Sequence, residues 1–79
     1  MGGRIVSDAD RRIADRVKAA RIAAGLSQTQ LGAALGISFQ QIQKYEGGAN
    51  RWSAGMLQAA AQQIGVPVAS FFDDASEAA

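Results

Sequence analysis

The stretch Ser27–Glu46, SQTQLGAALGISFQQIQKYE, is the part of the chain that decides the fold. Each half begins with a serine followed three residues later by a glutamine, at Ser27 and again at Ser38. This is the pattern of a capping box, in which both side chains satisfy backbone groups at a helix start. Gly36 stands between the halves, where a left-handed backbone conformation is favourable only without a Cβ. Two short helices joined by a tight turn are therefore predicted, the arrangement called a helix-turn-helix.

The apolar residues of this stretch support the same interpretation. Leu31 and Leu35 are four residues apart, and Ile42 and Tyr45 are three apart, the spacings of one face of an α-helix. Gly32 is small and lies on the inner side of the first helix. We therefore expect the second helix to cross close against it.

The flanking segments predict three more helices, over residues 8–24, 54–64 and 67–72. Ser7 and Ser53 are suited to cap the first two, and Pro67 is suited to the first turn of the last. Apolar stripes at helical spacing are expected at Ile13, Val17, Ala20 and Ala24, and at Leu57, Ala60, Ala61 and Ile64. With no strand pattern or internal repeat, the sequence predicts an all-α, compact five-helix domain.

The charged residues divide the chain. All eight Lys and Arg lie within residues 1–51, and residues 1–72 contain four Asp and Glu, so their net charge is +4 against +1 for the whole chain. Residues 73–79 are predicted to be an acidic, disordered tail. Residues 1–6 are predicted to be a flexible arm whose Arg4 either contacts DNA or is only solvated. A modestly basic domain over residues 7–72 is compatible with nucleic acid.

Composition argues against several classes of function. At 79 residues the chain is one small domain, and it has no Cys and no His. A disulfide framework and a thiolate metal site are therefore excluded, and the commonest general base and metal ligand are missing. We expect no enzyme activity, no cofactor and no metal. No apolar run approaches the length of a membrane span, and no basic-then-apolar leader is present, so we expect a cytoplasmic, nucleoid-associated protein.

Short motifs along the chain carry a family resemblance. They are Arg16-Val17-Lys18, Arg21-Ile22, Gly25-Leu26-Ser27-Gln28, Gly36-Ile37-Ser38, Gln40-Gln41-Ile42 and Tyr45-Glu46-Gly47. From about Arg11 to Phe72 the chain resembles the Cro/repressor (XRE-type) helix-turn-helix family, which is similar to lambdoid phage repressor DNA-binding domains. One departure is Gly32, where the family usually has alanine, at about 1 kcal/mol in helix propensity. The resemblance implies a regulator that inserts its third helix into the major groove of double-stranded DNA.

The resemblance also implies roles for individual residues. Arg21 and Glu46 are expected to form a partly buried ion pair between the first and third helices. Base contacts are expected from the third helix, and phosphate contacts from the start of the second helix and the loop after the third. The expected base-contacting residues are Ser38, Phe39, Gln40, Gln43 and Lys44, and the expected phosphate-contacting residues are Gln28, Thr29, Asn50 and Arg51.

Two aromatic residues allow more than one interpretation. Phe39 stands where phage repressors often have glutamine, and its ring would either contact a thymine methyl or pack beside the neighbouring helix. Trp52 is expected to anchor the loop in the core, with a DNA contact as the alternative.

Specific recognition by so small a domain requires two copies, and similar proteins pair through the last helix. Here the dimer interface is expected to involve Val66, Pro67, Val68 and Phe72. Val68 and Phe71 are also the expected contributors of this segment to the monomer core. A two-fold dimer would read half-sites about 34 Å apart.

The leading hypothesis is therefore a sequence-specific transcription regulator, most simply a repressor acting as a homodimer. One alternative is an antitoxin that neutralises a toxin partner and represses its own operon; a neighbouring toxin reading frame would favour it. Another is a protein-interaction module of the same fold without DNA affinity. The polar side chains of Gln40, Gln43 and Lys44 on the third helix argue against that module.

Overall fold

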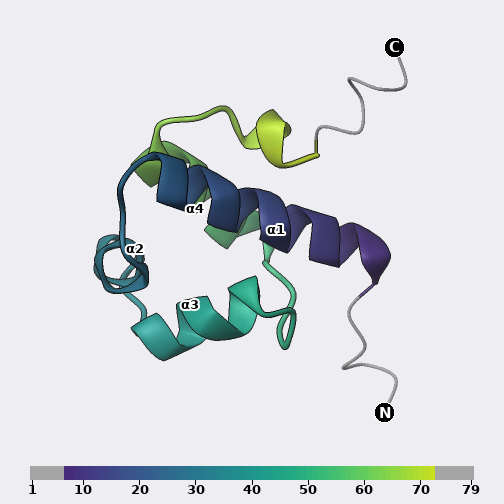
Figure 1. Ribbon diagram of the computed structural model, residues 1–79, viewed down its shortest axis with the longest axis horizontal. Coiled ribbons are helices and arrows are strands. Elements are labelled where there is room, and N and C mark those ends of the chain that lie inside the picture. The colour runs from purple at the N-terminus through teal and green to yellow at the C-terminus, as the bar shows by residue number, and fades with distance from the viewer. Residues whose placement is uncertain (1–6, 73–79) are drawn as a thin grey trace.

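The computed structural model describes residues 7–72, which form four α-helices and one short 3-10 segment (Figure 1). The predicted arm 1–6, with Arg4, and the predicted tail 73–79 lie outside the described residues. The helices are α1 Asp8–Ala23, α2 Gln28–Leu35, α3 Phe39–Glu46 and α4 Ala54–Ile64, followed by the 3-10 segment η2 Val68–Phe72. Within residues 7–72 there is no strand, and no helix is long and apolar enough to cross a membrane.

The prediction of a fifth α-helix over residues 67–72 is wrong in type, because this segment is a 3-10 helix over Val68–Phe72. The backbone amide of Ser70 donates to the carbonyl of Pro67 at 3.0 Å, and the Ser70 hydroxyl donates to the same oxygen at 2.7 Å. A bond across three residues is the 3-10 pattern, and so short a segment has too few residues for several α-helical turns.

The start of α1 is built as predicted, but its buried side is displaced. Ala14, Val17 and Arg21 are buried, whereas the predicted stripe member Ala24 is the exposed C-cap residue. The other predicted members, Ile13 and Ala20, are only half-buried. The predicted stripe counted apolar residues only and therefore omitted Arg21. The side that is actually buried is rotated about the helix axis relative to that stripe.

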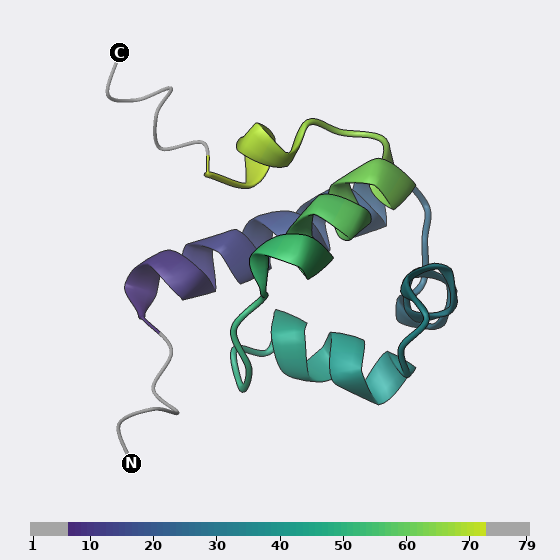
Figure 2. The ribbon, with the colours of Figure 1, turned by 180° about the vertical axis from the view of Figure 1, so that it is seen from behind.

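The helices pack in a definite order. α1 and α4 lie beside each other in the middle of the molecule, α3 lies on one side of them and η2 on the opposite side (Figures 1 and 2). α2 packs against both α3 and α4. All four helices and η2 contribute to one core, whose buried apolar residues are Ala14, Val17, Leu31, Ile42, Trp52, Leu57, Ala60, Ala61 and Phe71.

Two apolar residues of η2 differ in their exposure to solvent. Phe71 is 1% exposed and belongs to the core, as predicted. Val68 is 37% exposed, so the expectation that it fills the monomer core is wrong. Residues three apart lie on the same side of a 3-10 helix, so the difference comes from the position of η2 along α1 and α4, where the core encloses Phe71 and ends before Val68.

Trp52 anchors the loop between α3 and α4. It is buried, and its ring stacks on Tyr45 with centroids 4.2 Å apart and an angle of 20° between the planes. Its indole Nε1–H has no hydrogen-bond partner within residues 7–72. The packing prediction for Trp52 is confirmed, because the side chain stacks on Tyr45 and belongs to the buried apolar core.

Candidate nucleic-acid interface

The turn between α2 and α3 sets the angle of the motif. Gly36 ends α2 with a φ of +75°, in the left-handed region, as predicted. A Cβ on Gly32 would lie 2.8 Å from the carbonyl oxygen of Ile37, closer than side chains tolerate. The close crossing expected at Gly32 is therefore present. Glycine at position 32, where the family usually has alanine, therefore has a steric reason. An alanine methyl group would displace this turn.

The two capping serines of the motif behave differently. At α2, Ser27 and Gln30 form the complete predicted capping box. At α3, Ser38 accepts a hydrogen bond from the amide of Gln41, but the Gln41 side chain donates to Asn50 at 3.2 Å. The predicted capping box at Ser38 is thus only half formed: the Gln41 side chain donates to Asn50 and does not accept from the Ser38 amide. The bond connects the first turn of α3 to the loop that follows the helix.

One face of α3 points away from the rest of the molecule. We call the side chains of Phe39, Gln40, Gln43 and Lys44 the outer face; all four are exposed. Within residues 7–72, Gln40, Gln43 and Lys44 have no side-chain hydrogen bond or ion pair. A glutamine amide carries both a donor and an acceptor, which is the pairing needed to read a base edge.

On the inner side of α3, Glu46 is paired with Arg21 of α1. Arg21 Nε and Glu46 Oε2 are 2.6 Å apart, and Arg21 Nη2 and Glu46 Oε1 are 3.0 Å apart. Arg21 Nη1 also donates to the carbonyl of Leu26 at 2.8 Å. Both residues are buried, at 7% and 8% exposure. This two-point contact joins α1 to the end of α3 and fixes the rotation of the helix about its own axis.

Gln28 extends this contact to α2. Its side-chain Nε2 donates to Glu46 Oε1 at 3.0 Å, so the amide predicted to meet phosphate is already bonded within the protein. The backbone amides of Gln28 and Thr29 begin α2 and have no acceptor within residues 7–72. Such amides at the positive end of a helix dipole attract anions. The Thr29 side chain is exposed beside them.

The loop after α3 carries the other predicted phosphate contacts, Asn50 and Arg51, which are both exposed. Arg51 Nε lies 3.3 Å from Asp10 Oδ2 on α1, and the Arg51 side chain is 60% exposed. The pKa of Asp10 is lowered, mainly because the Ser7 hydroxyl donates to it, with further contributions from the Ser7 amide and Arg51. An exposed ion pair of this kind is weak, so the Arg51 guanidinium can exchange Asp10 for another anion.

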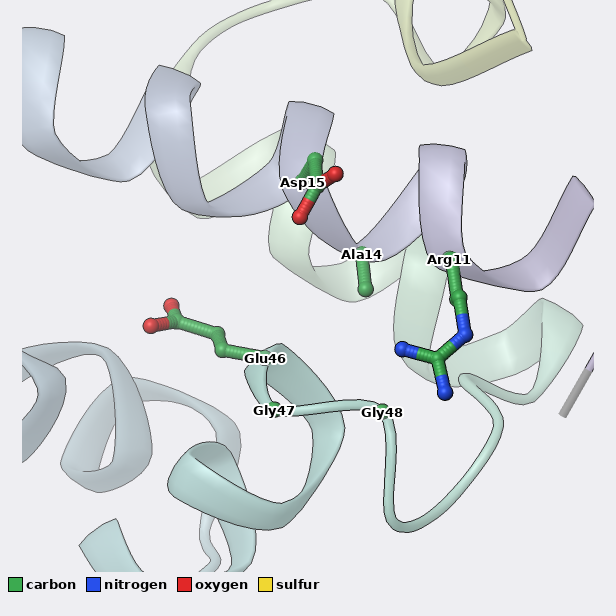
Figure 3. Close-up of a pocket in the computed structure, with 6 residues that line it drawn as sticks. All are labelled: Arg11, Ala14, Asp15, Glu46, Gly47 and Gly48. Atoms are coloured by element: carbon green, nitrogen blue, oxygen red, sulfur yellow. The ribbon is translucent and has the colours of Figure 1, made fainter. Parts of the chain in front are cut away.

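A small cleft of about 110 Å³ lies between α1 and the loop (Figure 3). The Arg11 guanidinium lies beside Gly48, and the Glu46 carboxylate points away from it (Figure 3). The volume is below that of typical organic ligand sites. Arg11 is a cation at this loop that sequence reasoning did not assign, since no local signal predicts its contact with Gly48. Within residues 7–72 no three His, Cys, Asp or Glu side chains are grouped to hold a metal ion.

Comparison with known proteins gives consistent matches. The model of a family described as helix-turn-helix matches residues 17–71. An uncharacterized HTH-type transcriptional regulator of Sinorhizobium medicae (strain WSM419) is 50% identical over 66 residues, covering 84% of this chain and 48% of that protein. The chain thus spans about half the length of that relative.

Solved structures share the fold. The clp gene regulator ClgR from Corynebacterium glutamicum superposes with a TM-score of 0.81 at 18% identity, covering 91% of this chain and 94% of ClgR. PlcR of Bacillus thuringiensis, solved in complex with the peptide PapR7 and DNA, superposes with a TM-score of 0.70 at 25% identity. That match covers 80% of this chain and 22% of PlcR.

Proposed function

The chain belongs to the XRE-type helix-turn-helix family of transcription regulators, and on this premise we propose that it is a sequence-specific repressor that binds a two-fold symmetric operator as a dimer. Residues 7–72 are the proposed DNA-binding unit. A regulator of this kind acts at the chromosome, so the proposed location is the cytoplasm, in association with the nucleoid. Repression would follow from occupying a promoter.

The outer face of α3 is the observation that carries the proposal. Its polar side chains are exposed and unbonded within residues 7–72, while the helix beneath them is held by the buried Arg21–Glu46 contact. An α-helix fits the major groove, where each base pair presents a distinct pattern of donors, acceptors and methyl groups. Rigid support with free polar side chains is the combination that direct base readout requires.

Gln40 is the proposed principal base contact. It lies in the first turn of α3, the end that approaches the bases in helix-turn-helix complexes. Its amide matches the N6 and N7 edge of adenine as a bidentate pair. Gln43 lies about one turn further and is proposed to bond a base or a phosphate. Lys44 is a flexible point charge better suited to a phosphate. Ser38 is proposed to donate its hydroxyl hydrogen, since its oxygen already caps α3.

Phosphate groups are proposed to bind on both sides of α3. On one side are the two free backbone amides at Gln28 and Thr29, with the Thr29 hydroxyl. The Gln28 side chain has a second amide hydrogen besides the one donated to Glu46, so it can bond a phosphate without breaking the internal contact. On the other side are Asn50 and Arg51 in the loop. Phosphate contacts at both edges position the helix and supply affinity.

Dimerisation is proposed through η2. Val68 and Phe72 are exposed at 37% and 47% and line one groove of about 420 Å³ with Ile13, Trp52 and Leu57. Pro67 is exposed beside them, whereas Val66 packs partly on the core and has less surface to offer. Exposed apolar residues that share a groove favour a protein contact. Both members of a two-fold pair would use this same surface.

The proposal is tested by selecting bound sequences from random DNA and titrating one enriched site. We expect a two-fold symmetric motif whose affinity falls steeply with salt, because bound phosphates release counterions. Gln40→Ala should weaken binding by about 1–3 kcal/mol and relax the preference at one position of each half-site. Gln62→Ala removes an exposed glutamine from α4 and is the matched control, with affinity unchanged. Absence of any enriched site, together with no binding at low salt, would refute the proposed function.

A further inference from the structure

We infer that Phe39 reads the C5-methyl group of a pyrimidine in the major groove, at the base next to the one contacted by Gln40. This inference rests on the proposed function and adds a specificity determinant to it. The shared chemical feature is a methyl group at C5, which thymine and 5-methylcytosine both present there. Thymine is the expected natural partner, because it carries this methyl without modification.

The surroundings of Phe39 decide between its two interpretations. Four large apolar residues are exposed within residues 7–72, and Phe39 is one of them, at 42%. Val68 and Phe72 share the groove at η2, and Ile22 lies in the last turn of α1. Phe39 alone of the four belongs to α3. Residues that fill the core under α3, such as Ile42 at 0%, are fully enclosed, and Phe39 is not one of them.

The side chains next to Phe39 are polar, so Phe39 is the residue of this surface that can make an apolar contact. The Ser38 oxygen caps the helix and the Gln41 side chain donates to Asn50, so each of these two side chains already has one partner within the protein. Phe39 and Gln43 lie on the same side of α3, because residues four apart are neighbours on a helix surface. The ring therefore lies beside Gln43, and it follows directly before Gln40, the proposed principal base contact. It has no donor or acceptor, and the apolar feature of a major groove is the pyrimidine methyl.

The expected size of the effect follows from the area involved. Burying one methyl-sized group against an apolar surface contributes about 0.8 kcal/mol, which corresponds to an affinity change of about four-fold for each half-site. This is smaller than the loss of a bidentate hydrogen bond. It is large enough to select a thymine at one position, and the selectivity would disappear with the ring.

The test replaces thymine by deoxyuridine, one position at a time, in the operator recovered by selection. For the wild-type protein we expect one thymine per half-site, next to the position relaxed by Gln40→Ala, whose change to deoxyuridine weakens binding about four-fold. In Phe39→Ala this response should fall below about 1.5-fold, and Phe39→Leu should keep part of it, since leucine retains apolar contact. Ile22→Ala, an exposed apolar residue outside α3, should keep the full response.

A second arm separates the two sources of the methyl. Replacing the thymine pair by cytosine–guanine should weaken wild-type binding, and 5-methylcytosine at that position should recover about four-fold of the loss. A wild-type protein insensitive to every methyl, or a response that is the same in Phe39→Ala, would overturn the inference. A selected half-site with no thymine beside the Gln40 position would also overturn it. In all these cases an operator has been selected, so the proposed function itself stands.

If Phe39→Ala binds too weakly to titrate, the scan of the wild-type protein and of Phe39→Leu still decides the matter. A urea unfolding midpoint equal to that of the wild type would show that the weaker binding is not a loss of fold.

Discussion

Helix α3 is only eight residues long, yet its two faces differ in their contacts. On the inner face, Ile42 is fully buried and Glu46 is bonded to Arg21 and Gln28. On the outer face, Phe39, Gln40, Gln43 and Lys44 are exposed. The inner face makes its contacts within the chain, and the outer face is available for contacts outside it. A substitution on one face should therefore change stability, and a substitution on the other should change binding.

Two adjacent phenylalanines give the largest expected contrast between an inward and an outward residue. Phe71→Ala removes a side chain that is 1% exposed and should lower the free energy of unfolding by about 3–5 kcal/mol, through lost transfer energy and a cavity. Phe72→Ala, at 47% exposure, should change it by less than about 1 kcal/mol. Urea denaturation followed by circular dichroism measures both values.

The same pair also tests the dimer. Sedimentation of Phe72→Ala should show a shift toward monomer relative to the wild type. Equal stability losses in Phe71→Ala and Phe72→Ala would contradict the inward–outward distinction at η2. A wild type that is monomeric at high micromolar concentration would contradict the dimer.

The ion pair provides the next test. Arg21→Ala leaves the buried Glu46 carboxylate with Gln28 as its remaining side-chain partner, and should lower stability by about 3 kcal/mol or more. Lys44→Ala, a cation removed from the outer face of the same motif, should lie within about 0.5 kcal/mol of the wild type. Comparable denaturation midpoints for the two variants would show that the buried pair contributes little. The Arg21→Met variant separates lost charge from lost side-chain volume.

Gly32 tests the tight turn, and Gly55 in α4 is the comparison. In Gly32→Ala the new methyl would lie 2.8 Å from the Ile37 carbonyl oxygen, and the strain should exceed the gain in helix propensity, with a net loss of about 1–2 kcal/mol. Gly55→Ala in the first turn of α4 has no atom within 4 Å of the new methyl and should instead stabilise by up to about 1 kcal/mol. A stabilised Gly32→Ala would show that the turn can open at little cost.

On the outer face, Lys44→Ala should leave folding intact and weaken DNA binding to a similar degree for all sequences. A plot of log affinity against log salt should become shallower by about one, because one fewer phosphate is neutralised. Filter binding or fluorescence anisotropy at several salt concentrations provides the slope. An unchanged slope with altered base preference would instead make Lys44 a base contact.

The smallest expected effect concerns Asp10, which lies outside both faces of α3. Its folded pKa is lowered from 3.8, so its contribution to stability is present above that value and is lost as the pH falls through the folded pKa. Asp10→Asn should therefore make the decline in stability on the acid side less steep. Titration of the Asp10 carboxyl by NMR measures the pKa directly, and a value at or above 3.8 would contradict the Ser7 and Arg51 contacts.

Prediction from sequence was most successful where the signal is local. The serine caps at Ser7, Ser27 and Ser53, the left-handed glycine at Gly36 and the bounds of α4 at Ala54–Ile64 all agree with the structure. A cap requires only residues within one helical turn, and a left-handed turn requires only the absence of a Cβ. Such features are encoded by a few neighbouring residues and need no knowledge of packing.

The sequence could not predict side-chain hydrogen bonds between residues that lie far apart in the chain. Gln41 bonds to Asn50 in place of the Ser38 amide, and Gln28 bonds to Glu46. Both partners are brought close by the packing of the helices. The candidate site was predicted as positions on α3, at the start of α2 and in the loop after α3. The internal bonds, which decide which of these side chains remain available, could not be predicted.

The sequence by itself determined four α-helices, their caps and the tight turn of the motif, because these depend on spacing and on local backbone preference. Tertiary structure alone decided that Val68 faces outward while Phe71 fills the core, that Arg11 lies against Gly48, and that Phe39 stays exposed beside Gln40. Each depends on which atoms of remote segments occupy the neighbouring space. Burial is a property of the packed molecule. The apolar pattern of a single helix predicts which residues are buried only to within one or two positions.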